Sequence, residues 1–411
     1  MDIPANENSS PARGNYFLKY LDFAGSIITN YNGIEPFHIY LKKYFSANKK
    51  HGSKDRKWIS SLCYNYFRLG FSVSSAVTLS NKLLLGAFLC DSNPSPLLSS
   101  LQPGLNDLME EHFEKKLNAV KDEFDLHHVF PFTSSLSDKI DEEKFSVSFL
   151  RQPKLFIRTR PRQEKKVLGK LGNLNISFEK ISHDCLAFSN NEKLTDALRI
   201  NKEAIIQDYN SQRAGAFFLK YFPGSNKHFN NRPPNVPINI WDCCAGSGGK
   251  SLLAFDLLQP VNLTVTDKRE NILFNLKKRF KEAAVKQYRS EVLNLGLNES
   301  RWNAEFDMLI ADVPCSGSGT WSRTPEQLNF FKESRIDEYS GLQKNIVTHA
   351  LKGLKSNGLL FYITCSVFKK ENEENVKYFL ENNDLSLIEM EYLKGYEMLA
   401  DTLFIAVLRK N

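Results

Sequence analysis

The second half of the chain alternates short apolar runs with helix-like stretches, from about residue 206 to the end. The runs are INIWD, LTVTD, FDMLIAD and GLLFYIT, and each begins or ends at a chain reversal. Alternating strands and helices are typical of a parallel sheet with helices on both faces. The pattern therefore predicts an α/β domain over residues 206–411, with ligands bound outside the carboxyl ends of its strands.

The first 145 residues show no strand-like alternation, and they are predicted to be all-helical. The clearest segment is GSKDRKWISSLCYNYFRLG, in which Trp58, Leu62 and Tyr66 recur every four residues. That spacing places them on one face of a helix, and Gly70 is a natural stop. We expect a helical scaffolding or binding domain over residues 1–145.

Residues 146–205 change character and are predicted to form a small α/β module. A helix is expected over Gln163–Leu171, with short strands near Ile176–Phe178 and at Cys185–Phe188. An earlier strand alternates between two faces. One face carries Leu155, Ile157 and Thr159, and the other carries Phe156, Arg158 and Arg160.

The positive charge of the chain is concentrated in this module. Residues 151–170 hold eight Lys or Arg and one Glu, a net charge of +7 that equals the net charge of all 411 residues. Such a basic patch is typical of nucleic-acid binding, although a solvated basic face is the alternative. We expect Arg158, Arg160 and Phe156 to contact RNA.

Length and composition favour a multidomain cytoplasmic protein. The polar start of the chain does not resemble a signal peptide, and the longest apolar run, Leu83–Cys90, is too short to span a bilayer. Seven dispersed cysteines without a CxxC pair argue against a disulfide framework and against a metal site. A cysteine with a role here is more likely to be catalytic than structural.

The segment WDCCAGSGGKS directly follows the strand INI. Gly246, Gly248 and Gly249 allow the backbone to approach a ligand and then enter a helix. A Walker A loop would need glycine at Cys244, and a dinucleotide loop would need glycine at Ser251. The remaining readings are a site for a nucleoside without a pyrophosphate, or a purely structural tight turn.

Asp267 ends the strand LTVTD, 21 residues after Gly246. An acidic residue at this distance from a glycine loop can accept hydrogen bonds from ribose hydroxyls. Because a helical segment follows, Asp267 is equally suited to cap that helix.

Two cysteines end strands that are predicted to be consecutive. Asp312 and Cys315 follow FDMLIA, and Cys365 follows GLLFYIT. Cys365 lies between Thr364 and Ser366, whose hydroxyls could donate to a thiolate. A buried cysteine is usually a small apolar residue, but two thiols and a carboxylate at neighbouring strand ends could share one cleft.

The motifs DCCAGSGGKS, DVPCSGSG and YITCSV together resemble those of the RNA 5-methylcytosine methyltransferases, and most closely the bacterial rRNA enzymes of the RsmB/Fmu (Sun) type. IIQDYNSQRAG resembles the family's entry to its catalytic domain, and LFIRTR its small RNA-binding module. The first helical segments resemble its NusB-like domain. The resemblance implies an all-α NusB-like domain, an RNA-binding module and a Rossmann-like class I methyltransferase domain, in that order.

The resemblance also assigns roles. Cys365 would be the nucleophile, Cys315 the second cysteine, associated with product release, and Asp312 the contact to the target cytosine. S-adenosyl-L-methionine would be the cofactor. Its site would comprise Cys244, Ala245, Gly246, Ser247, Gly248, Gly249, Lys250, Asp267, Asn294 and Asp312. The chain departs from the family where Gly246 and Ser247 replace the usual Ala and Pro, and where Asn294 or a neighbour replaces an acidic residue near the adenine.

The predicted activity is methylation of carbon 5 of a cytosine in ribosomal RNA. A thiolate that adds to carbon 6 makes carbon 5 nucleophilic, and the base must be unstacked to react. A monomer without metal is expected. The alternatives are the same chemistry on tRNA, a catalytically silent RNA-binding assembly factor, and an exocyclic-amine or small-molecule methyltransferase, which would not require paired cysteines.

Overall fold

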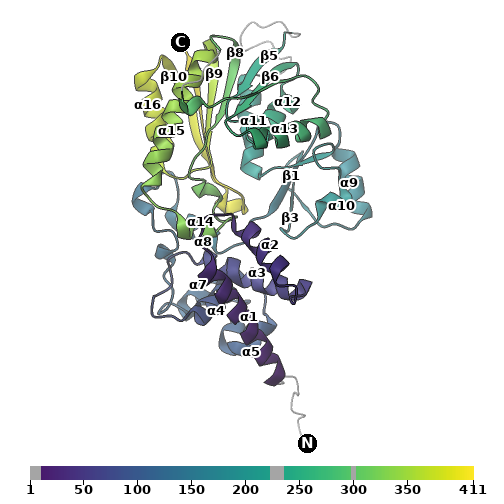
Figure 1. The fold of residues 1–411 in the computed structure, drawn as a ribbon, viewed down its shortest axis with the longest axis vertical. Helices are drawn as coiled ribbons and strands as arrows, with labels where there is room; N and C mark the ends of the chain where they lie inside the picture. The colour runs from purple at the N-terminus through teal and green to yellow at the C-terminus, as the bar shows by residue number, and fades with distance from the viewer. Residues whose placement is uncertain (1–10, 223–235, 298–301) are drawn as a thin grey trace, which may run out of the picture. The chain divides into compact units, whose positions relative to one another are not determined.

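The computed structural model describes residues 11–222, 236–297 and 302–411 (Figure 1). The chain forms two compact units that exchange short segments. The first contains the chain up to Ser134 together with Asp141–Gln152 and Trp321–Lys332. The second contains Ser135–Ile140, Pro153–Thr320 and Glu333–Asn411. The small α/β module and the C-terminal α/β region therefore belong to one unit, although the sequence suggested separate domains.

The first unit is helical, as predicted. In α3 the side chains of Ile59, Leu62 and Phe67 are buried, while Asp55 in the first turn accepts the Gly52 N–H at 2.8 Å. The likeness to NusB stays a prediction. The helices are α1 Pro11–Asn30, α2 Phe37–Ala47, α3 Ser53–Arg68, α4 Leu79–Cys90, α5 Pro96–Leu101, α6 Pro103–Asn106, α7 Phe113–Ala119, α8 Glu142–Phe149 and α14 Glu326–Phe330.

The segment Trp321–Lys332 joins the helical unit through one buried cation and an aromatic cluster. Arg68 is 2% exposed, and it donates to the carbonyls of Phe149 at 2.9 Å and of Ser322 at 2.7 Å. The Trp321 ring lies 4.8 Å from the Phe331 ring, centroid to centroid. A buried arginine is tolerated here because carbonyl acceptors replace its water.

The second unit is built around a seven-stranded sheet in the order β10-β11-β9-β8-β5-β6-β7. Its central strands are parallel, whereas β11 runs antiparallel to both β9 and β10. The four predicted strands are all present. The strands are β5 Ile238–Asp242, β6 Val261–Asp267, β7 Arg289–Val292, β8 Phe306–Asp312, β9 Leu354–Thr364, β10 Leu385–Leu393 and β11 Leu403–Lys410.

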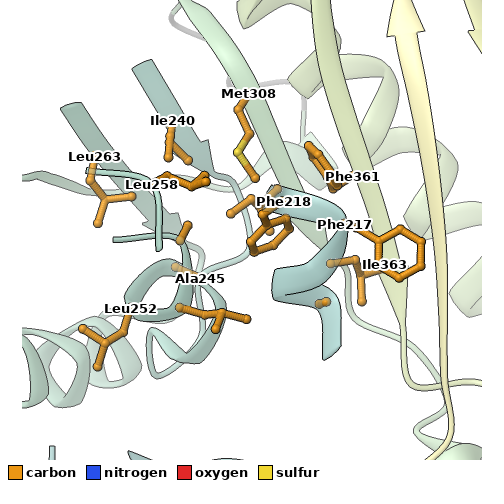
Figure 2. Packing of buried hydrophobic residues seen from close by; sticks show 14 of the residues in the cluster. Phe217, Phe218, Ile240, Ala245, Leu252, Leu258, Leu263, Met308, Phe361 and Ile363 are labelled. Atoms are coloured by element: carbon orange, nitrogen blue, oxygen red, sulfur yellow. The ribbon is translucent and has the colours of Figure 1, made fainter. Parts of the chain in front are cut away.

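Helices cover both faces of this sheet, which explains why its central strands read as continuous apolar runs. Figure 1 shows α11, α12 and α13 on one side and α15 and α16 on the other. In Figure 2 the Phe218 ring points at Phe361 of β9, and the two centroids are 5.1 Å apart. The bounds are α11 Tyr209–Tyr221, α12 Gly249–Leu257, α13 Glu270–Glu282, α15 Arg335–Ala350 and α16 Glu373–Asn382.

A four-stranded antiparallel sheet in the order β2-β3-β1-β4 precedes the large one. The strands predicted at 155–160 and 185–188 are present, and the helix predicted over 163–171 is α9. The elements are β1 Leu155–Thr159, α9 Glu164–Asn173, β2 Glu179–Lys180, β3 Cys185–Phe188, α10 Leu194–Ala197 and β4 Ala204–Ile206.

None of the helices in the described ranges is long and apolar enough to cross a membrane. The polar start of the chain, from which we expected no signal peptide, lies outside the described residues.

Candidate functional site

The carboxyl ends of the parallel strands meet at one edge of the large sheet. Asp242, Asp267, Asp312 and Thr364 are the last residues of β5, β6, β8 and β9. The order of strands reverses around β5, and such a reversal is where open α/β sheets bind ligands. A cavity of about 800 Å³ lies there. Its lining includes Cys244, Gly246, Lys250, Asp267, Asn294, Asp312, Cys315, Arg335, Tyr339 and Cys365.

The glycine loop that the sequence singled out lines this cavity between β5 and α12. Gly246 has φ +52° and Gly248 has φ +82°, both in the left-handed region that favours glycine. A Cβ on Gly248 would lie 2.7 Å from the Phe280 ring, whereas a Cβ on Gly246 would meet open space. Gly248 is therefore required for packing, and Gly246 leaves its backbone accessible to a ligand.

Asp242 anchors the loop from beneath, where it is fully buried. Its Oδ2 accepts the Ser251 hydroxyl at 2.5 Å, which ties β5 to α12. Its Oδ1 has no hydrogen-bond partner in the described part of the chain. Burial raises the pKa of Asp242 to about 7, and the Asp312 charge adds to the shift although the Ser251 hydrogen bond opposes it.

Asp267 lines the cavity beside the glycine loop. Its Oδ2 accepts the Gly246 N–H at 3.0 Å, and its Oδ1 accepts both the backbone N–H and the Nε of Arg269 at 2.9 Å. Burial opposes ionisation, but the hydrogen bonds from Arg269 hold the pKa of Asp267 below its ordinary value. The helix α13 begins three residues later, at Glu270, so Asp267 also fastens the turn into that helix.

Lys250 and Asp312 form an ion pair across the cavity floor, with Nζ and Oδ2 separated by 2.9 Å. The sequence placed Lys250 with the cofactor, and its pairing with Asp312 was missed. Burial lowers the pKa of Lys250, but the Asp312 charge and hydrogen bond outweigh burial, and the net shift is upward. Lys250 therefore stays a cation beside the exposed part of Asp312.

Cys315 and Cys365 are brought together, as their positions at neighbouring strand ends predicted. Their Sγ atoms lie 3.2 Å apart. The pKa of Cys315 is raised well above its ordinary value, because of the contact with the Cys365 thiol and because of burial. The flanking hydroxyls do not donate to the Cys365 sulfur as expected. Thr364 donates to Asn372 at 2.5 Å, and Ser366 donates to Glu371 at 2.6 Å.

The exposed basic face predicted on β1 is wrong. Arg158 is 2% exposed, and its Nη2 pairs with Asp256 of α12 at 2.8 Å. Arg160 pairs with the same carboxylate at 2.6 Å, and Phe156 is buried in a cluster with Cys185. The two arginines thus join the small sheet to α12, and Phe156 packs against Ala187 and Ala400, so none of the three lies on an exposed basic face. Burying the two guanidinium groups requires a carboxylate partner, and Asp256 provides it.

Other members of the lining were not foreseen. Arg335, Glu338 and Tyr339 come from the first turns of α15, where the sequence shows only an ordinary amphipathic pattern. Asn294 does line the cavity, next to a short 3₁₀ turn that begins at Leu295. Its expected contact with an adenine stays a prediction.

The cavity therefore combines two thiols in contact, a lysine–aspartate pair and a carboxylate beside an open glycine loop. Such a set can hold a polar ligand with hydroxyls and place a soft nucleophile beside a fixed positive charge. In the described residues, no group of three His, Cys, Asp or Glu side chains is arranged to hold a metal ion.

Residues 232–402 match the family model described as 16S rRNA methyltransferase RsmB/F. Ribosomal RNA small subunit methyltransferase B of Shewanella oneidensis is 34% identical over 152 residues, which cover 36% of this chain and 34% of that protein. The enzyme of the same name from Escherichia coli O6:K15:H31 is 34% identical over 163 residues, covering 38% and 37%. The match thus spans about a third of the length of either relative.

Among solved structures, PH0851 has a TM-score of 0.66 at 18% identity, covering 98% of this chain and 100% of that one. NSun6 from Pyrococcus horikoshii with SFG has a TM-score of 0.55 at 16% identity, covering 68% and 96%. At such identities the likeness concerns the fold, and it confirms the predicted Rossmann-like methyltransferase architecture.

Proposed function

We propose that this chain methylates carbon 5 of a cytosine in ribosomal RNA, and the proposal starts from the match of residues 232–402 to the RsmB/F methyltransferase model. The observation that carries the proposal is the contact of 3.2 Å between the Cys315 and Cys365 sulfurs on the wall of the cavity. Methylation of an exocyclic amine or of a small molecule does not need two thiols in contact.

S-adenosyl-L-methionine is the proposed methyl donor, and the residues of the cavity suit it. Gly246 offers open backbone, and Asp267 can accept from the ribose hydroxyls. Cys244 to Gly249 would surround the nucleoside and the methionine part, with Asn294 near the base. When bound, the donor supplies an electrophilic methyl group on its sulfonium.

The chain's own residues would prepare the cytosine for that methyl group. The Cys365 thiolate adds to carbon 6, which breaks the aromaticity of the ring and makes carbon 5 nucleophilic. Asp312, beside the Lys250 cation, hydrogen-bonds the edge of the base and stabilises charge that develops on the ring. After methyl transfer a base, either the Cys315 sulfur or a water, takes the proton from carbon 5. The electron pair of that C–H bond restores the double bond of the ring, and the bond from carbon 6 to sulfur breaks to release the Cys365 thiolate.

Cys315 would act on the second half of the cycle. Its Sγ lies 3.2 Å from that of Cys365, which places it to exchange a proton with its neighbour. We assign the attack to Cys365 and release of the product to Cys315.

A flipped base needs a basic surface around the cavity mouth, and β1 does not provide it. Lys268, Arg269 and Arg335 are exposed and line the cavity instead. We propose these three cations as phosphate contacts. The chain is proposed to act as a monomer in the cytoplasm.

Bisulfite sequencing of total RNA from cells with and without this protein tests the activity and its target together. The proposal predicts a cytosine in small-subunit rRNA that resists conversion only when the protein is present. A cytosine in tRNA that resists conversion only when the protein is present would identify tRNA as the substrate instead. Identical conversion of every cytosine in both samples would refute the proposed methylation and favour a catalytically silent RNA-binding factor.

A further inference from the structure

The two cysteines are supplied by loops that are far apart in the chain. Cys315 follows β8 and Cys365 follows β9, 50 residues later, yet their sulfurs are in contact at 3.2 Å. Pairing of the two parallel strands ends at Asp312 and Ile363, so the sheet itself does not hold the loops beyond that point. Beyond the sheet, direct hydrogen bonds join the two loops: the Gly319 N–H donates to the Cys365 carbonyl at 2.8 Å, and the Val367 N–H donates to the Ser318 hydroxyl at 2.9 Å.

Glu371 adds a buried carboxylate that bonds to both loops directly beside the cysteines. It ends the 3₁₀ turn Lys369–Glu371, and its side chain is completely buried beneath both loops. One carboxylate oxygen, Oε2, accepts the Ser316 backbone N–H at 2.9 Å. The other, Oε1, accepts the Ser366 hydroxyl at 2.6 Å. Ser316 and Ser366 are the residues that directly follow the two cysteines.

Gln343 of α15 extends the clamp to the residue before Cys315. Its Nε2 donates to Glu371 Oε2 at 2.8 Å and to the Pro314 carbonyl at 3.0 Å. The loop that bears Cys315 is therefore held on both sides of the thiol. The network is buried, and in a buried network each donor that loses its acceptor is costly.

A carboxylate is the group that this geometry requires. It has two equivalent acceptor oxygens and no donor, so each oxygen serves one loop. Glutamine would keep one acceptor and replace the other by an amide donor. Turned toward Ser366, that donor would meet a hydroxyl that already accepts the Phe368 N–H and the Ser316 hydroxyl. Burial raises the pKa of Glu371 against the hydrogen bonds from Ser316, Ser366 and Gln343, so this arrangement is held at a cost in solvation.

We propose that Glu371 is a positioning residue that clamps the two cysteine loops together and thereby sets the separation of the Cys315 and Cys365 sulfurs. Its role in catalysis rests on the proposed function. The clamp itself is a property of the fold and is testable without any RNA.

The test compares E371Q with a matched control, E326Q. Glu326 is also a buried carboxylic acid with a pKa raised by burial, and it accepts one backbone N–H, that of Phe37, at 3.4 Å in the helical unit. Each purified full-length protein is treated with diamide. The two thiols lose two hydrogens to the azo reagent and form the Cys315–Cys365 disulfide, which is followed by peptide mass.

We expect disulfide formation in E371Q to be slower by about 10-fold or more, because a displacement of about 1 Å between reacting groups already has a large effect on rate. E326Q should react at the wild-type rate. Equal rates in E371Q and wild type would overturn the proposal, as would equal slowing in the two variants, which would indicate a general effect of a buried glutamine.

S366A guards against a folding failure of E371Q, because it keeps the buried carboxylate and removes the hydrogen bonds of one hydroxyl, which are those to Glu371 Oε1, to the Ser316 and Ser318 hydroxyls and to the Phe368 N–H. It should slow the disulfide less than E371Q does, and a rate equal to wild type would contradict the clamp. Methylation assays add a second readout: E371Q should lower kcat while the Kd for S-adenosyl-L-methionine stays unchanged. If wild type methylates no RNA but the disulfide rates still differ, the proposed function fails and the clamp stands.

Discussion

Lys250 shows how a residue can line a predicted site and yet serve another partner. The glycine loop suggested a role toward the cofactor, whereas the ammonium is aimed at Asp312 at 2.9 Å. K250M should therefore lower kcat by about 10²-fold, the usual cost of removing an electrostatic stabiliser, with little change in cofactor affinity. Single-turnover methylation and calorimetry measure the two quantities. A parallel loss of cofactor affinity would indicate that Lys250 contacts the cofactor.

Asp242 makes the stability of the fold depend on pH. Its folded-state pKa of about 7 lies above the ordinary 3.8, so the folded protein holds the proton more tightly than the unfolded chain. The stabilisation of the folded state by this proton is fully present below pH 4 and is lost as pH rises through 7. Relative to D242N, wild type should lose about 2 to 3 kcal/mol of unfolding free energy between pH 5 and pH 7. Urea denaturation at the two pH values checks it, and a constant difference would contradict the raised pKa.

At the scale of elements, the large sheet could be predicted and the small one only in part. Runs such as FDMLIAD are largely apolar because the middle of β8 is buried on both faces, and such runs are easily recognised in the sequence. The strand β1 also alternates as expected, but alternation does not reveal what covers its second face. Asp256, the partner of Arg158 and Arg160, lies almost 100 residues away, and no local pattern connects them.

The ion-pair cluster of Arg158, Arg160 and Asp256 should now affect stability, not RNA recognition. D256A leaves two guanidinium groups in the interior without their carboxylate, which typically costs about 3 to 5 kcal/mol. E111A, which removes the exposed pair with Lys115, should cost less than about 1 kcal/mol. Chemical denaturation compares them. Equal small losses would mean that the cluster is solvated.

At the scale of the whole molecule, no pattern in the sequence indicated that the units exchange segments. The boundaries predicted near 145 and 205 follow changes of composition, but Trp321–Lys332 is returned to the helical unit by Arg68 and by aromatic packing, contacts that a linear pattern does not contain. Likewise, the strand ends, the glycine loop and both cysteines were recognisable in the sequence, whereas Glu371 was not, because its partners are backbone and hydroxyl groups of two separate loops.

Segment exchange predicts that residues 153–411 will not behave as an isolated domain. Trp321 and Leu328 are buried in the helical unit, at 1% and 0% exposure, and the truncated chain would expose them. Its tryptophan emission should shift to the red, and it should bind a hydrophobic dye. A truncated form with Trp321 and Leu328 changed to Ser should bind less dye. Native-like emission from the unmodified fragment would contradict the exchange.

The central claim is that the Cys365 thiolate attacks the cytosine while Cys315 releases the product. The direct measurement is trapping of a covalent protein–RNA adduct on a denaturing gel, using total small-subunit rRNA and S-adenosyl-L-methionine with C315A, C365A and the double variant. We expect an adduct in C315A and none in C365A or in the double variant. An adduct in C365A, or none in any variant when wild type methylates the same RNA, would contradict it.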